Sequence, residues 1–241
     1  MNKWLNNNLF YSNLRQCLFC LEPTANPHSL CEHCESALPV NRHHCLICSS
    51  PFAAVASDHP GLVCGQCQKN PPSYNTSVIP YLYASPLKQS ITTLKFQRNL
   101  SYVPLLAHIF IHALRTRRSK MPECILPVPL HPKRLQQRGF NQALELLRII
   151  ATQLGIPVDY SLCQRNKDTP FQSGLSAKQR KQNLRNAFTV TRSQPYKHIA
   201  IFDDVVTTGS TVNELSRKLK TSGAEIIEVW AIARTISAHQ K

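Results

Sequence analysis

The sequence contains no apolar run long enough to cross a membrane. Its longest candidate, residues 103–114, is interrupted by Pro104, His108 and His112, whereas a membrane-spanning helix needs about 20 mostly apolar residues. The first 16 residues also lack the long apolar core and small-residue cleavage site of a secretory signal. These absences exclude a transmembrane helix and predict a cytoplasmic protein.

Two common nucleotide-binding motifs are missing as well. No GxxxxGK[ST] sequence occurs, which disfavours a P-loop nucleoside triphosphatase. No GxGxxG sequence occurs either, which disfavours a Rossmann dinucleotide site. Any phosphate-binding function must therefore come from a different motif.

Acidic residues are scarce. The chain has 13 Asp and Glu against 28 Lys and Arg, which gives a net charge of +15. Residues 1–77 contain four bases and four acids, so the whole excess lies after residue 77. Such a surplus favours a polyanionic partner, either nucleic acid or a phosphorylated small molecule. A generally basic surface without a partner is the alternative.

Eight of the ten cysteines form four Cys-x-x-Cys units. Two such units complete a tetrahedral zinc site, and four sulfur ligands leave no open position for substrate, so the sequence predicts two structural zinc ions. Four disulfides are the alternative, but the missing secretory signal favours a reducing compartment and hence metal. The predicted ligands are Cys17, Cys20, Cys31, Cys34, Cys45, Cys48, Cys64 and Cys67.

The spacing leaves two ways to pair these units. Sequential pairing separates the units of the first site by ten residues and those of the second by fifteen. Both spacings suit small zinc ribbons, so we predict this arrangement over a cross-brace in which the sites interleave. Eight thiolates and two Zn²⁺ add about −4 to the charge, which makes the module acidic.

The cysteines divide the chain into four parts. Residues 1–16 form an N-terminal segment, 17–67 a double zinc-ribbon module, 68–77 a linker and 78–241 a second domain. Alternating strand and helix patterns in the second domain are typical of a parallel α/β sheet flanked by helices. Strands are expected at residues 77–84, 124–128, 199–202 and 224–233, and helices at 86–96, 103–116, 141–154 and 211–221.

The segment IAIFDDVVTTGST, residues 199–211, combines three features. An apolar strand ends at Asp203 and Asp204, and a short loop with Gly209 then leads into a helix. Ligands of open α/β sheets bind at the carboxyl ends of strands, and the N-terminus of a helix offers N–H groups to phosphate. Two adjacent carboxylates accept hydrogen bonds from a vicinal diol, so the segment predicts a ribose-5-phosphate site. An ordinary Ser/Thr helix cap is the alternative, but it leaves the two acids unexplained.

The same segment resembles the 13-residue phosphoribosyl-diphosphate signature of type I phosphoribosyltransferases. Two further stretches, PVPLHPKRLQQRGFNQA (127–143) and RNKDTPFQSGLSAKQRKQNLRNAF (165–188), resemble the ComF family, as does the cysteine module. The resemblance covers about residues 17–234. It implies a type I phosphoribosyltransferase fold behind a double zinc-ribbon module, and a role in DNA uptake and utilisation during natural competence.

The resemblance also implies roles for particular residues. Asp203 and Asp204, as the catalytic pair, would hold the ribose hydroxyls, and residues 165–172 would form a loop that closes over the site. Mg²⁺ would bridge the diphosphate oxygens while a nitrogen nucleophile displaces pyrophosphate from the anomeric carbon. Phosphoribosyl diphosphate would be bound by Lys133, Arg134 and Arg138 at the diphosphate and by Thr207, Thr208, Gly209, Ser210 and Thr211 at the 5-phosphate. The alternative for residues 138–142 is a turn that caps the following helix.

Three functions remain open at this stage. The first is a phosphoribosyltransferase, whose acceptor the sequence does not reveal. The second is a single-stranded DNA-binding protein whose phosphoribosyl ligand regulates binding, and the third is an adaptor that docks a competence helicase or another uptake protein. Basic segments outside the predicted site favour contact with single-stranded DNA, although residues 178–185 could instead be a solvated helix face. The candidate contacts are Arg115, Arg117, Arg118, Lys120, Lys178, Arg180, Lys181 and Arg185.

Overall fold

The centre of the molecule is a parallel sheet. The computed structural model describes residues 15–52, 61–115, 117–167 and 184–236 of the chain. The strand order is β3-β9-β8-β5, adjacent strands are parallel, and a short β4 also pairs with β9. The strands are β3 (Thr76–Val78), β4 (Tyr81–Leu82), β5 (Cys124–Pro127), β8 (His198–Val206) and β9 (Ile226–Arg234). The predicted parallel α/β architecture is confirmed.

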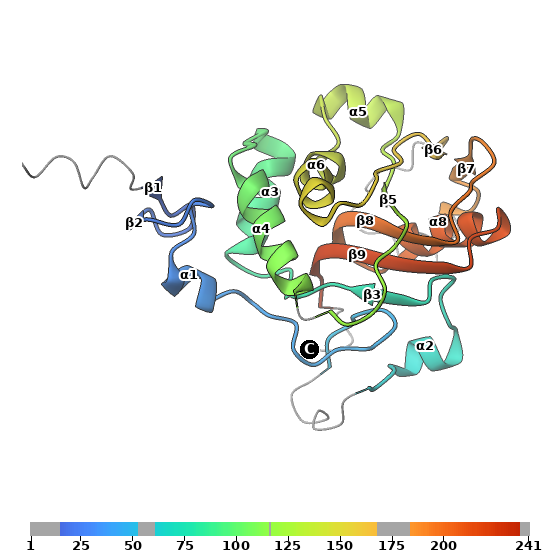
Figure 1. Cartoon of the computed structure of the whole chain (residues 1–241), viewed down its shortest axis with the longest axis horizontal. Coiled ribbons are helices and arrows are strands. Elements are labelled where there is room, and N and C mark those ends of the chain that lie inside the picture. The colour runs from blue at the N-terminus through green and yellow to red at the C-terminus, as the bar shows by residue number, and fades with distance from the viewer. Residues whose placement is uncertain (1–14, 53–60, 116, 168–183, 237–241) are drawn as a thin grey trace, which may run out of the picture.

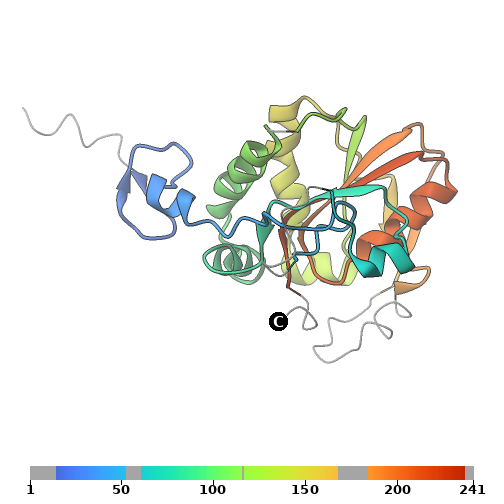
Figure 2. The same ribbon diagram turned by 90° about the horizontal axis from the view of Figure 1, so that it is seen from below.

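Helices cover both faces of this sheet (Figures 1 and 2). Ala200 and Phe202 of β8 pack with α3, α4 and α6, whereas Ile199 and Ile201 pack with α8 on the other face. Burial on both faces explains why β8 and β9 are nearly continuous apolar runs. The helices are α3 (Leu87–Gln97), α4 (Tyr102–Leu114), α6 (Gln142–Leu154) and α8 (Ser210–Thr221). None of the helices in the described part of the chain has the length and apolar character needed to cross a membrane.

The strand that precedes the signature loop is longer than predicted. Its sequence pattern places the end at residue 202, but the ladder with β9 continues to Val206. Asp203 and Asp204 therefore lie within β8, near its carboxyl end, rather than beyond it. Beyond the cysteine-rich part, three short elements of the described chain are absent from the prediction, because they carry too few apolar residues for a periodic pattern. They are α5 (Pro132–Arg138), β6 (Cys163–Arg165) and β7 (Phe188–Val190), the last two paired antiparallel.

The cysteine-rich part consists of two halves in different places. The first half lies beyond α3 and α4, at the opposite end of the molecule from α8, and the second half lies beside β3 (Figures 1 and 2). Leu30 and Leu38 of the first half share a hydrophobic core with side chains of α4. The short elements of both halves are β1 (Arg15–Gln16), β2 (Pro23–Thr24), α1 (Glu32–Ser36) and α2 (Gly65–Lys69).

The second half is bonded directly to the sheet. The Thr76 and Ser77 hydroxyls donate to the backbone carbonyls of Leu46 and Ile47, each at 2.8 Å. The Asn75 backbone N–H donates to the Ile227 carbonyl at 2.8 Å. Residues 75–77, expected to lie in the linker, thus connect the second zinc ribbon to the edge of the sheet.

Candidate functional site

Two acidic side chains from β8 form the floor of the site. Asp204 is 2% exposed, and its backbone N–H donates to Asp203 Oδ1 at 2.9 Å. The ammonium of Lys95, from α3, lies 2.5 Å from Asp204 Oδ2. Sequence reasoning missed Lys95, because a single lysine in an amphipathic helix carries no motif.

The two carboxyl groups have opposite pKa shifts. Burial, together with the negative charge of Asp204, raises the pKa of Asp203 well above its ordinary value. Burial alone would raise the pKa of Asp204 too, but the charge and hydrogen bond of Lys95 outweigh it, and the pKa of Asp204 is lowered. The two shifts have opposite directions because two adjacent carboxylates repel each other and Lys95 stabilises the charge on Asp204.

The signature loop turns sharply above these groups. Gly209 has φ 76° and ψ 0° at the N-terminus of α8, a left-handed conformation that favours glycine. The Thr208 and Ser210 hydroxyls hydrogen-bond each other at 2.9 Å, whereas Thr207, Gly209 and Thr211 line the adjoining cavity. The 12-residue α8 directs its N-terminal N–H groups toward this loop, an arrangement that suits an anion.

The basic residues after β5 separate into two groups. Arg134 and Arg138 line the cavity, but Lys133 is exposed on α5 and is not among the residues that form its wall. Arg138 donates to Gln142 Oε1 at 2.6 Å, which orients its guanidinium. The structure thus brings two of the three predicted diphosphate ligands to the site.

The RGFNQ motif, residues 138–142, also caps helices, which was the alternative to ligand binding. Gly139, with φ 83°, ends α5. Asn141 begins α6, because its side chain accepts a hydrogen bond from the Ala143 backbone N–H at 3.0 Å. Arg138 and Gln142 face the cavity in the same motif, so one short segment both ends and starts a helix and supplies a cationic side chain.

One cavity joins all these parts. Its volume is about 720 Å³, within the usual range of 300–1,000 Å³ for small-molecule sites. Arg165, at the start of the predicted mobile loop, is also in its wall, while residues 168–172 of that loop lie outside the described residues. The charged residues of the wall are Lys95, Arg98, Arg134, Arg138, Arg165, Asp203 and Asp204.

Arg117, a predicted DNA contact, forms an ion pair within the protein. Its guanidinium donates two hydrogen bonds to the Glu228 carboxylate, at 2.8 and 2.6 Å, and a third to the Lys120 carbonyl at 2.8 Å. The side chains of Arg117 and Glu228 are only 9% and 4% exposed. The buried ion pair disfavours the DNA contact predicted for Arg117, because a DNA phosphate would have to break the pair to reach the guanidinium.

The other predicted DNA contacts that the structure describes lie in two segments of the chain, residues 115–120 and residue 185. Arg115, Arg118 and Lys120 are exposed near Arg117, which contacts the first half of β9. Arg185 is exposed beside the β6–β7 hairpin, where its carbonyl accepts a hydrogen bond from Lys167 at 2.8 Å. That hairpin carries Arg165 at the cavity, whereas Lys178, Arg180 and Lys181 lie outside the described residues.

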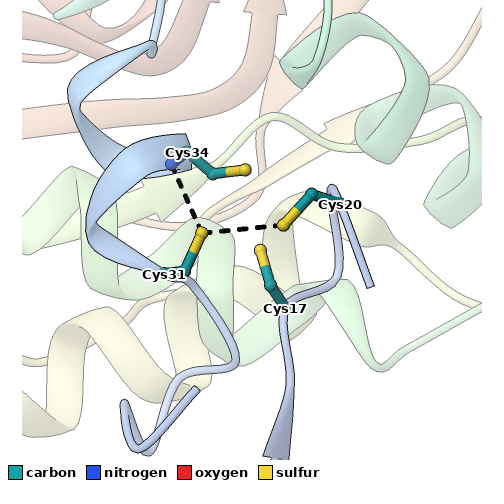
Figure 3. A group of neighbouring side chains, drawn as sticks. All are labelled: Cys17, Cys20, Cys31 and Cys34. Carbon is teal, nitrogen blue, oxygen red and sulfur yellow. Dashed lines mark hydrogen bonds between the residues drawn. The ribbon is translucent and has the colours of Figure 1, made fainter. Parts of the chain in front are cut away.

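The cysteines form two separate candidate metal centres. Four Sγ atoms of Cys17, Cys20, Cys31 and Cys34 lie within 4.8 Å of one another and point toward a common centre (Figure 3). Cys45, Cys48, Cys64 and Cys67 form the second group with the same limit. This grouping confirms sequential pairing, and all ten cysteines, each within the described residues, are free thiols rather than disulfides.

The geometry of both groups fits zinc. The Sγ atoms of Cys20 and Cys31 are 3.6 Å apart, and those of Cys48 and Cys64 are 3.7 Å apart. A tetrahedral site with Zn–S distances of about 2.3 Å places its sulfurs about 3.8 Å apart. Burial would raise the pKa of Cys17 and Cys45, but backbone N–H groups outweigh it and lower the two values to about 6 and about 7. In each group, these hydrogen bonds stabilise one of the four thiolates that zinc requires.

The chain is similar to known proteins along most of its length. A double zinc ribbon domain matches residues 8–68. Competence protein F of Haemophilus influenzae is 38% identical over 226 residues, which cover 89% of this chain and 96% of that protein. DNA utilization protein YhgH of Escherichia coli K12 is 36% identical, with coverage of 91% and 97%. Adenine phosphoribosyltransferase from Leishmania tarentolae has a TM-score of 0.36 and 14% identity, over 61% of this chain and 78% of that one.

Proposed function

This chain belongs to the ComF family of competence protein F and YhgH, and from that premise we propose that it binds phosphoribosyl diphosphate and transfers its phosphoribosyl group to a nitrogen acceptor. The observation that carries the proposal is the single cavity. It joins an acidic pair on β8, the N-terminal loop of α8 and two arginines of α5. These are the groups that a ribose diol, a 5-phosphate and a diphosphate each require.

Each part of the cavity has a distinct task in this reaction. Asp204 accepts hydrogen bonds from the ribose hydroxyls, and Asp203, beside it on β8, offers a second hydrogen-bonding group whose pKa is raised. The loop around Gly209 holds the 5-phosphate with backbone N–H groups. Arg134 and Arg138 bind the diphosphate and stabilise the negative charge that develops when it leaves. Mg²⁺ carried by the diphosphate supplies further neutralisation of that charge.

Replacing Asp204 with asparagine is expected to weaken binding of Mg²⁺–phosphoribosyl diphosphate by about tenfold to a hundredfold, the usual value of a charge-assisted hydrogen bond. Gly209→Val is expected to weaken binding as well, because a branched side chain disfavours φ 76° and occupies the approach of a phosphate oxygen. Isothermal titration calorimetry measures both, with thermal melts to confirm folding. Glu225→Gln is the matched control, since Glu225 is 66% exposed and pairs with Lys197 away from the cavity. If both variants bind as the parent does, the signature no longer serves a ligand and the proposal fails.

A second function, binding of single-stranded DNA, is favoured by the distribution of charge. The excess of basic residues lies entirely after residue 77, and the name of the relative YhgH refers to DNA utilisation. Arg115 and Arg118 are exposed and lie outside the cavity wall. Both remain available to phosphates when a small ligand fills the cavity.

Reversing Arg115 and Arg118 to glutamate is expected to lower the affinity for a single-stranded oligonucleotide and its dependence on salt. Each phosphate contact contributes about 0.7 to the slope of log K against log salt on a single strand, so two lost contacts lower the slope by about 1.4. Fluorescence anisotropy at several salt concentrations measures this change. Binding of phosphoribosyl diphosphate should remain, and an unchanged DNA slope would remove these arginines from the DNA surface.

A further inference from the structure

The last turn of α3 connects two walls of the cavity. Lys95 reaches Asp204 on β8, at 2.5 Å. Three residues later, Arg98 donates to the Gln137 carbonyl of α5 at 3.0 Å. Between them, the Phe96 ring lies 5.8 Å from the guanidinium carbon of Arg138. The end of α3 is thus fixed to the strand that carries the acidic pair and to the helix that carries the cavity arginines.

Lys95 is placed where the acidic pair needs a cation. Its side chain is 19% exposed and that of Asp204 is 2% exposed, so both charges have left most of their water. A buried charge is tolerated when it is paired, and removing one partner leaves the other uncompensated. The groups that face the pair electrostatically are Asp203 on the same strand, Arg138 of α5 and Tyr83, which precedes α3. Arg138 is not in ion-pair contact with either carboxylate, whereas Lys95 is.

We propose that Lys95 is a positioning residue of the phosphoribosyl site, which fixes the orientation and the negative charge of Asp204 so that this carboxylate accepts the ribose hydroxyls. The inference rests on the proposed function. Lys95 acts through Asp204, since the ammonium contacts the carboxylate from the α3 side. With Lys95 removed, Asp204 loses the cation that contacts it at 2.5 Å, so protonation of this buried carboxyl becomes more favourable.

The pH dependence of binding tests this assignment. For Lys95→Met, titration calorimetry with Mg²⁺–phosphoribosyl diphosphate from pH 5.5 to 8.5 is expected to show at least tenfold weaker binding near pH 6. That deficit relative to the parent should shrink as pH rises and Asp204 ionises. Lys95→Arg keeps the positive charge and is expected to recover part of the affinity. Lys88→Met is the matched control, because Lys88 is exposed on the same helix and its loss should leave the parent profile unchanged.

A double variant separates positioning from direct contact with the ligand. If Lys95 acts only through Asp204, then Lys95→Met/Asp204→Asn should bind as Asp204→Asn alone does. This comparison also holds if Lys95→Met alone folds poorly, since the double variant removes both members of the Lys95–Asp204 ion pair. Additive losses would overturn the positioning role, and a Lys95→Met profile equal to that of the parent would overturn it without affecting the proposed function. Failure of the parent protein to bind the ligand would overturn both.

Discussion

Replacing Cys45 with serine is expected to remove one of two zinc ions and to destabilise the edge of the central sheet. Zinc binding contributes about 10–16 kcal/mol to the folding of small zinc modules, so loss of one ligand unfolds the ribbon that depends on it. The second ribbon is bonded to β3 through Thr76 and Ser77, and Arg234 of β9 donates to the Cys48 carbonyl at 3.1 Å. Elemental analysis should give a zinc ratio near one, and the midpoint of thermal unfolding should fall.

The first zinc site provides a direct comparison. Cys20→Ser is also expected to lower the zinc ratio to one. The first ribbon, however, contacts the rest of the protein chiefly through α4, where the Tyr102 hydroxyl donates to the Leu18 carbonyl at 3.4 Å. Binding of phosphoribosyl diphosphate should therefore survive Cys20→Ser better than Cys45→Ser. Cys163→Ala is the control, because this buried thiol belongs to neither group and its loss should leave the ratio at two. A parent ratio near one would exclude one of the two sites, and four disulfides would exclude both.

The zinc centres were predictable because their signal is local. Each Cys-x-x-Cys unit forms one turn, and two consecutive turns need only a short loop to meet, so spacing alone anticipated the observed grouping. The signature segment is similar, since strand, acids and loop follow one another from Ile199 to Thr211. The prediction for this segment was wrong in one respect, the length of β8. Two acids interrupt the apolar pattern, so the predicted strand ends too early. The backbone hydrogen bonds between strands do not depend on side-chain charge, and the pairing of β8 with β9 continues to Val206.

Partners from distant parts of the chain could not be predicted in the same way. Lys95 meets Asp204 and Arg117 meets Glu228 across more than 100 residues. Arg117 also belongs to a basic cluster in the sequence. Clustering alone does not distinguish a solvated arginine from one that forms a buried ion pair. One signal was available, because Glu228 lies between the apolar residues Ile227 and Val229 of the final strand. A carboxylate in a buried strand requires a cationic or hydrogen-bonding partner. The sequence does not identify which residue is that partner.

Three side chains contact the Glu228 carboxylate. Besides Arg117, the Trp230 indole N–H donates to Oε2 at 2.8 Å, and His198 Nε2 lies 3.0 Å from Oε1. Burial would raise the pKa of Glu228, but Arg117, Trp230 and His198 together outweigh burial and lower it. Because the pKa is lowered in the folded state, the stabilisation is present above the unfolded value of 4.5 and is lost as pH falls below it.

Replacing Arg117 with methionine is therefore expected to lower the free energy of unfolding by about 3–5 kcal/mol at neutral pH, because the buried carboxylate loses its cation. The midpoint of thermal unfolding should fall by roughly 6–20 °C for a chain of this size. Urea denaturation of parent and variant measures the difference, which should shrink below pH 4.5 as Glu228 takes up a proton in both proteins. Arg118→Met is the matched control, since the exposed side chain should change stability by less than about 0.5 kcal/mol. If Arg117→Met instead weakens DNA binding without loss of stability, the buried ion pair does not form in solution. Arg117 would then be a DNA contact.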